Sequence, residues 1–109
     1  MIPSLRQNAV AHLEKANGTI ADGLAAPFVG ELNLAHAQHY VDDMVLVTDE
    51  EIIAAMRLIM ERCKFVVEPA GAAAYAALLA GKIDVAPGAR VVSLLTGGNV
   101  DRDRLKDIL

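Results

Sequence analysis

The residues of this chain best suited to hold a ligand are Thr96, Gly97, Gly98 and Asn99, which follow directly on the apolar run of residues 90–95. A buried strand that ends in two glycines leaves the Thr96 hydroxyl and the neighbouring backbone amides free to face a ligand. In open α/β sheets, ligands bind at such carboxyl ends of strands, where the chain turns toward a helix. The same residues also make an ordinary tight turn, in which glycine supplies positive φ and Asn99 caps the following helix. On their own, the four residues leave both interpretations open.

A second set of chemically capable residues lies nearer the middle of the chain, where His36 and His39 are followed by Asp42 and Asp43. Two histidines three residues apart on a helix, with a carboxylate nearby, could offer a metal three ligands, as a catalytic zinc site requires. No further ligand cluster accompanies them, and histidines on an exposed helix are common. The two aspartates would point to opposite faces of a strand, so they cannot act as an acid/base pair. We therefore expect no metal site.

The best-determined structural element is a helix that begins after Thr48. Thr48 and Glu51 form a capping box, in which the threonine hydroxyl accepts from the Glu51 amide and the glutamate carboxylate reaches back to Thr48. Apolar residues then recur at helical spacing and define one stripe, which consists of Ile52, Met56, Ile59 and Cys63. The pattern predicts a helix over residues 49–63.

The other elements follow from weaker patterns. Helices are predicted over residues 3–16, 31–40, 69–80 and 101–109, strands over residues 41–47 and 90–95, and a short strand or loop over residues 19–24. Pro3 and Pro69 suit the first turns of their helices. Gly18 and Gly81 suit the left-handed position just past a helix end. This order of helices and strands indicates an α/β fold with a mostly parallel sheet.

The composition bounds the chain to one domain with an excess of apolar residues. At 109 residues the chain is long enough to bury one core. Counting glycine and leaving out tyrosine, about 60% of its residues are apolar, against about 45–50% in typical globular domains. This excess indicates a buried sheet or a piece of something larger.

Charge and residue usage exclude several classes of protein. The formal net charge is −4 with both signs interspersed, and there are two Phe, two Tyr and no Trp, so we expect no nucleic-acid binding. The single cysteine excludes an internal disulfide and fits a reducing compartment. No apolar run approaches the roughly 18 residues that span a bilayer, and no signal peptide is visible. The expectation is a cytoplasmic protein that enters no membrane.

Four segments of the chain together carry a family pattern. They are T-I-A-D-G-L at 19–24, V-D-D-M-V-L-V-T-D-E-E-I at 41–52, M-R-L-I-M-E-R-C-K-F-V-V-E-P-A-G-A-A at 56–73 and T-G-G-N-V-D at 96–101. From about Thr19 to Leu105 the chain resembles the C-terminal part of the fold-type II pyridoxal-phosphate enzymes, specifically the threonine dehydratase and serine racemase group. The resemblance implies that residues 1–109 form a single partial domain. That domain is part of a three-layer α/β sandwich with a mostly parallel sheet, the C-terminal half of a large domain like that of tryptophan synthase β.

What the resemblance implies is a pyridoxal 5'-phosphate cofactor and a lyase reaction, the elimination of water from threonine or serine to give a 2-oxo acid and ammonia. The implied cofactor-binding residues are Thr96, Gly97 and Asn99 in the turn, Gly23 and its neighbour Asp22 against one face of the ring, and Glu68 on the pocket wall. The family has a serine at the place of Thr96, whose hydroxyl hydrogen-bonds the pyridine nitrogen. Threonine keeps that hydroxyl, and a neutral partner does not hold the nitrogen protonated, which suits elimination.

The reactive parts of the family pattern are not found in this sequence. In the family, the Schiff-base lysine lies in an S-F-K-x-R-G motif, the loop for the substrate carboxylate in an S-x-G-N motif, and the phosphate grip in a run of glycines. None of the three occurs here, and the lysines have other contexts; they are Lys15, Lys64, Lys82 and Lys106. Without an activated lysine there is neither a covalent attachment for the cofactor nor a base for the α-proton. We therefore expect no catalytic residue, and activity only with the missing N-terminal portion or a partner chain.

Two functions are open at this point. The first is a C-terminal fragment or split part of a threonine or serine dehydratase that is inactive alone. The second is a non-catalytic assembly or binding module derived from the same fold. In the second case, the apolar surface left bare by the missing half would be covered by self-association, so we expect a homo-oligomer.

Overall fold

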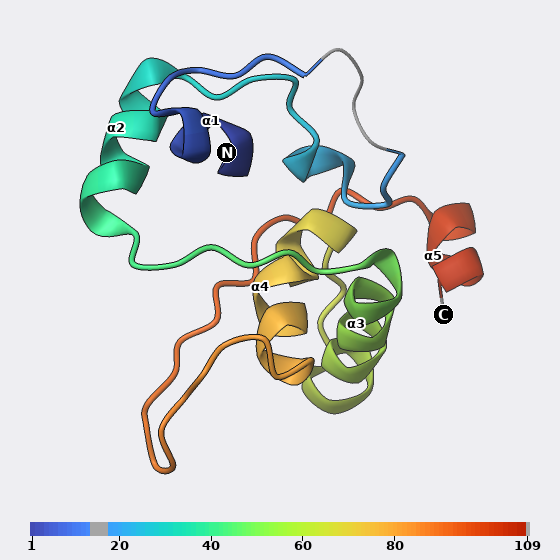
Figure 1. Ribbon diagram of the computed structural model, residues 1–109. Coiled ribbons are helices and arrows are strands. Elements are labelled where there is room, and N and C mark those ends of the chain that lie inside the picture. The colour runs from blue at the N-terminus through green and yellow to red at the C-terminus, as the bar shows by residue number, and fades with distance from the viewer. Residues whose placement is uncertain (14–17, 109) are drawn as a thin grey trace.

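The computed structural model describes residues 1–13 and 18–108, which form five α-helices and one 3-10 turn joined by long irregular segments. In chain order the elements are α1 (Ile2–Gln7), η1 (Asp22–Leu24), α2 (Glu31–Tyr40), α3 (Asp49–Cys63), α4 (Pro69–Leu79) and α5 (Arg102–Ile108). The molecule is flat, with extents of 40 × 37 × 19 Å. Figure 1 shows α1 and α2 together at one end and α3, α4 and α5 at the other.

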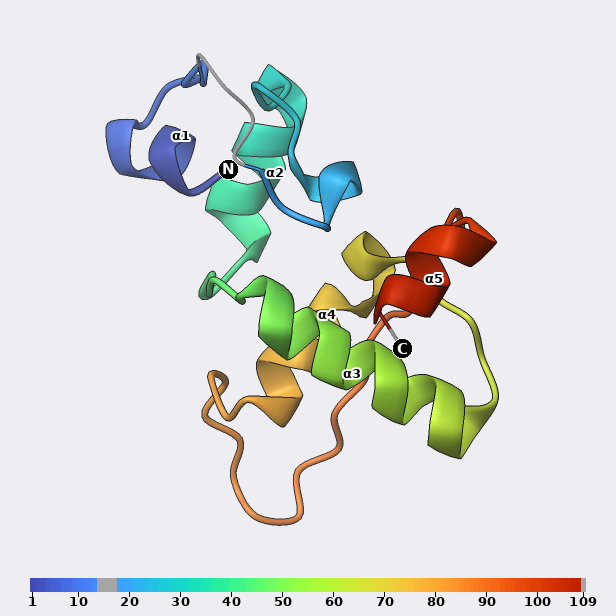
Figure 2. The same ribbon diagram turned by 90° about the vertical axis from the view of Figure 1, so that its right-hand side faces the viewer.

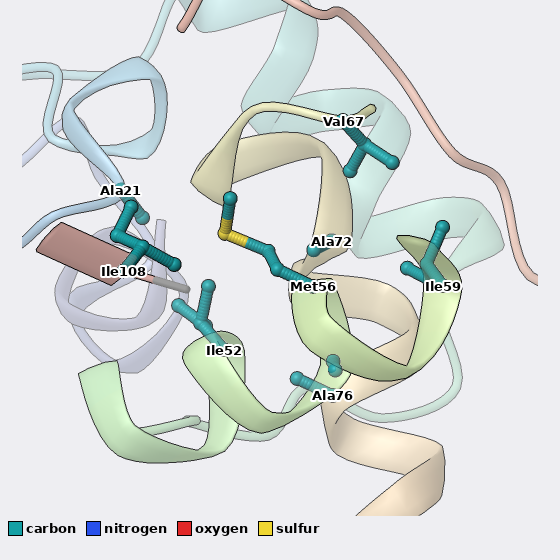
Figure 3. Packing of buried hydrophobic residues seen from close by; sticks show 9 residues of the cluster. Ala21, Ile52, Met56, Ile59, Val67, Ala72, Ala76 and Ile108 are labelled. Carbon is teal, nitrogen blue, oxygen red and sulfur yellow. The ribbon is translucent and has the colours of Figure 1, made fainter. Parts of the chain in front are cut away.

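The core lies between α3 and α4, which pack side by side (Figure 2). Its buried members are Ile52, Ala55, Met56 and Ile59 of α3, Ala72 and Ala76 of α4, and Ala21, Val67 and Ile108 from the surrounding segments (Figure 3). The alanines of α4 let the two helices approach closely. Because Ala21 and Ile108 join the same cluster, the core also brings η1 and α5 together, although they lie near opposite ends of the chain.

The helix α3 begins and ends where the sequence predicts. The Thr48 Oγ1 accepts a hydrogen bond from the Glu51 amide at 3.3 Å, and the Thr48 amide donates to Glu51 Oε2 at 2.7 Å. The predicted capping box is therefore confirmed. At the other end Lys64 adopts the left-handed conformation, with φ of 62°. The predicted apolar stripe is buried except for Cys63, which lies exposed in the last turn.

The predictions for α2, α4 and α5 are confirmed, with small shifts at the ends. The helix α2 spans Glu31–Tyr40, as predicted, and α4 ends one residue early, before Gly81 with φ of 66°. The start of α5 is capped by Asp101, whose Oδ1 accepts the Arg104 amide at 2.8 Å, so Asn99 is not the cap. No helix among the described residues is long and apolar enough to cross a bilayer.

The predicted helix over residues 3–16 is too long. Helix α1 ends at Gln7, because Asn8 adopts the left-handed conformation with φ of 54°. Asparagine is one of the few residues that tolerates this conformation, which ends a helix. The buried Ser4 then reinforces the stop, since its hydroxyl accepts the Ala11 amide at 3.0 Å. Residues 14–17 lie outside the described residues. Gly18 is described and does not have positive φ, so the predicted left-handed stop at Gly18 is wrong.

The predicted strands over residues 41–47 and 90–95 are the main correction. Within the described residues neither segment is a strand and no sheet forms; both run as single drawn-out traces (Figure 1). A strand needs the backbone of a neighbouring strand to accept and donate its hydrogen bonds. Leu46, Val92 and Leu94, which a sheet would bury, are instead largely exposed. The described chain thus has the helices of an α/β fold without the predicted parallel sheet.

Candidate functional site

The turn at residues 96–99 lies against the first turn of α4 and is held there by Glu68. Glu68 is the N-cap of α4, and its amide donates to the Gly97 carbonyl at 3.3 Å. Its Oε2 accepts the Asn99 amide at 3.0 Å. The backbone and the side chain of one residue therefore hold the turn at two points, and three of the residues singled out in the sequence meet here.

Two glycines allow this close approach. Gly97 has φ of 72°, and a Cβ there would lie 2.3 Å from Glu68 Oε1. On the helix side, a Cβ at Gly71 would lie 1.7 Å from the Thr96 carbonyl oxygen. A larger residue at either position would push the turn away from α4. Gly71 escapes prediction from sequence, where the only signal is its place among the small residues of α4.

The turn η1 faces the same end of α4. A Cβ at Gly23 would lie 3.0 Å from the Cβ of Ala70 and 4.0 Å from Glu68 Oε1, so the bare backbone of Gly23 is what lets η1 come this near. Three segments far apart in the sequence, around Gly23, Glu68 and Thr96, thus meet at one edge of the molecule. The family resemblance implies these residues for the cofactor, and that role stays a prediction.

The segment that carries Gly23 is fixed by both α3 and α5. At the start of α3, Asp49 Oδ2 accepts the Ile20 amide at 3.2 Å. From α5, Arg104 donates to the Ile20 carbonyl at 2.6 Å and pairs with Asp22 Oδ2 at 3.0 Å. Arg104 therefore clamps the backbone just before Gly23, and no local pattern points to it, because 82 residues separate it from Asp22.

Asp22 is directed to this clamp rather than to the turn at residues 96–99. Its side chain is largely exposed, with Oδ1 accepting the Gly23 amide at 2.9 Å and Oδ2 paired with Arg104. The hydrogen bond and the positive charge of Arg104, with the Gly23 amide, hold the pKa of Asp22 below its ordinary value. Asp22 is therefore an ionised residue at neutral pH that positions Gly23.

The polar groups left free at this edge include a hydroxyl. It belongs to Thr96, which is exposed. Its carbonyl, by contrast, is packed against Gly71. The backbone of Thr96 is thus fixed while its side chain is open to a ligand.

The lysines whose contacts are described are engaged elsewhere. Lys82 Nζ pairs with Glu51 at 2.7 Å, Lys64 Nζ donates to the Glu61 carbonyl at 2.7 Å, and Lys106 Nζ pairs with Asp103 at 2.9 Å, while Lys15 lies outside the described residues. None of the three described amines contacts Glu68 or the turn. The edge can orient a ligand through a hydroxyl, a carboxylate and backbone groups, but these lysines supply it with no nucleophilic amine.

The histidines are not gathered with the acidic residues. His36 Nδ1 lies 2.8 Å from the Leu32 carbonyl, and the ring of His39 packs edge-on against Tyr40 with centroids 4.5 Å apart. Within residues 1–13 and 18–108, no group of three His, Cys, Asp or Glu side chains is placed to hold a metal.

The chain matches one protein family along most of its length. Residues 2–97 match the family described as pyridoxal-phosphate dependent enzyme. The match begins well before Thr19, where the sequence resemblance starts, and ends at Gly97 in the turn held by Glu68. Helix α1 thus lies within the family match as well.

Three known proteins show what this chain is similar to in sequence and structure. The catabolic L-threonine dehydratase TdcB of Staphylococcus aureus (strain N315) is 42% identical over 97 residues, which cover 87% of this chain and 28% of that protein. The T.th. threonine deaminase is 36% identical, with a TM-score of 0.74 over 91% of this chain and 35% of that one. Maize serine racemase is 35% identical, with a TM-score of 0.78 over 96% of this chain and 34% of that one.

These similarities show the family of the chain and the share of its relatives' length that it covers. It spans only 28 to 35% of the length of these three relatives. The predicted resemblance to the threonine dehydratase and serine racemase group is confirmed, and pyridoxal phosphate is the cofactor of the family. The chain belongs to the pyridoxal-phosphate-dependent enzymes.

Proposed function

We propose that this chain forms one wall of the pyridoxal-phosphate site of a threonine or serine dehydratase, an ammonia-lyase that eliminates water from a hydroxyamino acid. The observation that carries the proposal is the hold of Glu68 on the turn at residues 96–99, beside Gly23. Together these contacts bring three distant segments to one edge of the molecule, where we place the ligand. The threonine dehydratase and threonine deaminase among the relatives support the reaction and its substrate class.

The residues at this edge fit the pyridine ring of the cofactor. Gly23 and Gly97 present exposed bare backbone and pack so closely on the start of α4 that a Cβ would meet Ala70 or Glu68. Thr96 adds an exposed hydroxyl. A flat ring with one polar ring atom calls for apolar or bare walls and a single placed polar group. When bound, pyridoxal phosphate supplies the electron sink for loss of the α-proton.

Each residue of the edge has a distinct task in this proposal. Thr96 would donate a hydrogen bond from its hydroxyl to the ring nitrogen and, being neutral, would not keep that nitrogen protonated. Glu68 is committed to the Asn99 amide and keeps Thr96 in place rather than exchanging protons with substrate. Arg104 holds Ile20 and Asp22, and so would keep Gly23 in place beside the ring.

The reactive amine then belongs to the part of the relatives' polypeptide that has no counterpart in this chain. The three described lysines contact Glu51, Glu61 and Asp103, away from the edge. The relatives extend over about three times the matched length. On this view the 109-residue chain is the C-terminal half of the cofactor-binding domain and is inactive alone. The free thiol of Cys63 is in keeping with the reducing cytoplasm.

The test is a complementation assay. The purified chain with pyridoxal phosphate and L-threonine should form no 2-oxobutanoate. Co-expression with the unmatched remainder of the Staphylococcus aureus dehydratase should restore it, and Thr96→Ala should reduce kcat/KM by about tenfold, the equivalent of one hydrogen bond. Thr96→Ser, which keeps the hydroxyl, is the matched control. Ketoacid from the chain alone would overturn its assignment as an incomplete site, and a folded complex without ketoacid would overturn the reaction.

The second function, a non-catalytic assembly module, is favoured by the large apolar side chains that lie exposed. Leu46, Val92 and Leu94 are the most exposed of those in the drawn-out segments. Self-association that buries them would give a stable homo-oligomer. Sedimentation of the purified chain distinguishes the two functions. If the chain is part of a dehydratase, adding the unmatched remainder of the dehydratase should convert any self-associated form into a mixed complex.

A further inference from the structure

The hydroxyl of Thr19 makes two hydrogen bonds, one as a donor and one as an acceptor. It donates to Asp49 Oδ1 at 2.5 Å, and it accepts the Ala21 amide at 3.2 Å. Asp49 is the first residue of α3 and lies 30 residues further along the chain. The hydroxyl therefore ties the start of α3 to the backbone of Ala21, two residues before Gly23.

Asp49 holds the same segment through both of its carboxylate oxygens. While Oδ1 accepts the Thr19 hydroxyl, Oδ2 accepts the Ile20 amide at 3.2 Å. An ionised carboxylate is an acceptor on both oxygens, whereas an asparagine would leave one of the two donors facing an NH₂ group. Thr19 and Asp49 are both half-buried, where a hydrogen bond is stronger than in open water.

The hydrogen bonds continue from Ala21 to the turn that contains Gly23. Ala21 is buried in the core, and its carbonyl accepts the Leu24 amide at 2.9 Å. That bond closes η1 around Gly23. Ala21 is thus held at its amide by Thr19 and closes the turn with its carbonyl. A shift of Thr19 would therefore be passed on to Gly23.

The place of Gly23 is narrowly defined. A Cβ on Gly23 would lie 3.0 Å from the Cβ of Ala70, which is closer than an ordinary van der Waals contact. Gly23 is itself exposed, so burial in the core does not fix it. Its place depends on the hydrogen bonds of the segment before it, which Arg104 makes from α5 and Asp49 makes from α3.

We propose that Thr19 and Asp49 are positioning residues for the cofactor, which set where the bare backbone of Gly23 stands beside the pyridine ring. The inference rests on the proposed function, because that function places the ring at Gly23. Both residues act through the backbone of Ile20 and Ala21. Loss of either should weaken cofactor binding although no group that contacts the cofactor is removed.

Hydrogen exchange in the free chain, followed by NMR, tests the connection between Thr19 and the turn. The Leu24 amide is the probe, because a substitution at Thr19 changes neither this amide nor its acceptor. Thr19→Val has the shape of threonine without the hydroxyl and should speed exchange at Leu24 about fivefold, the equivalent of one hydrogen bond. Thr19→Ser keeps the hydroxyl and should exchange as the wild type does. Unchanged exchange in Thr19→Val overturns the inference.

Cofactor binding tests the consequence. Absorbance titration gives the dissociation constant for pyridoxal 5'-phosphate in the complex with the co-expressed remainder of the Staphylococcus aureus dehydratase. Thr19→Val should raise this constant about fivefold, and Thr19→Ser should restore it. Gly88→Ala is the matched control: its φ of 80° makes alanine unfavourable, but nothing lies within 4 Å, so it lowers stability without reaching the edge. An equal rise in Thr19→Val and Gly88→Ala would reflect lost stability alone and overturns the inference.

A second variant covers the case in which Thr19→Val does not fold, which circular dichroism of the free chain would show. Asp49→Asn keeps one acceptor oxygen and opposes one donor with its NH₂ group, so it should also raise the dissociation constant for the cofactor. Unchanged binding in a folded Asp49→Asn complex counts against the positioning role.

The outcomes keep the inference apart from the proposed function. A wild-type complex that binds pyridoxal 5'-phosphate and makes ketoacid, while Thr19→Val binds the cofactor equally well, would refute the positioning role and leave the proposed function standing. A wild-type complex that forms but binds no pyridoxal 5'-phosphate would refute the proposed function, and the positioning role with it.

Discussion

Glu68 joins the start of α4 to Asn99, whose amide donates to Glu68 Oε2 at 3.0 Å. The acceptor is a carboxylate, which makes this bond stronger than one between neutral groups. It also lies at the N-terminus of a helix, where negative charge is favourable. One side chain therefore stabilises the helix electrostatically and fixes the turn that carries Thr96.

Removing the Glu68 carboxylate should loosen that turn. We expect Glu68→Ala to lower the free energy of unfolding by about 1 kcal/mol, because it leaves the Asn99 amide without its acceptor. Glu68→Gln keeps an acceptor oxygen and should lose less. Urea unfolding measures the stability and hydrogen exchange at Asn99 reports the bond; equal stability of wild type and Glu68→Ala would contradict the role.

A side chain at Gly97 should be costly for two reasons that a control can separate. Gly88→Ala carries only the cost of a left-handed conformation, about 1 kcal/mol, since its φ is 80° and nothing lies within 4 Å. Gly97→Ala has φ of 72° and also a Cβ 2.3 Å from Glu68 Oε1, so it should cost roughly 1–3 kcal/mol more. Urea unfolding of the two variants gives the difference, and equal losses would refute the contact with Glu68.

Gly71→Ala should destabilise the chain although alanine is the better helix former. Helix propensity alone favours alanine by about 1 kcal/mol. The new Cβ would, however, lie 1.7 Å from the Thr96 carbonyl oxygen, so the turn must move. A thermal melt that shows a higher midpoint for Gly71→Ala than for wild type would contradict the packing of the turn on α4.

The capping box sets the start of α3. Thr48→Ala should cost about 1 kcal/mol, because the Glu51 amide loses its acceptor. Thr48→Ser retains the hydroxyl and is the control, with little expected change. Thermal melts of both variants make the comparison, and equal losses would show that the methyl group, rather than the cap, matters.

Because of the Asp22–Arg104 pair, the stability of the chain should depend on pH in the acid range. Arg104, first by its hydrogen bond and then by its charge, lowers the pKa of Asp22 from 3.8 in the folded chain. The contribution is therefore fully present above that value and disappears as the pH falls through the lowered pKa. Asp22→Asn should be slightly less stable than wild type at neutral pH and equally stable in strong acid. High salt should narrow the gap, because the pair is exposed; an acid-independent difference would refute it.

Local signals predict most of the helices. The capping box defines α3, and Pro69 with Gly81 brackets α4, because caps and breakers act within a few residues. The first helix is predicted too long because Asn8 carries no obligatory stop: asparagine tolerates the left-handed conformation but does not demand it.

Strand pairing and contacts between distant segments cannot be predicted from signals that act within a few residues. The apolar runs at 41–47 and 90–95 have the composition of strands, yet strand formation depends on a neighbour that the described chain does not provide. The residues of the edge, Glu68 and Thr96 among them, follow from the family pattern. Arg104 does not, because its partners lie on a different segment and no spacing relates them.

The drawn-out segment at residues 90–95 also bears on how the chain avoids aggregation. Unpaired extended backbone beside exposed Val92 and Leu94 is a template on which further chains can add as strands, the way ordered aggregates grow. A partner that covers these residues would therefore protect the chain from its own copies. While these residues stay bare, folding of the chain competes with aggregation.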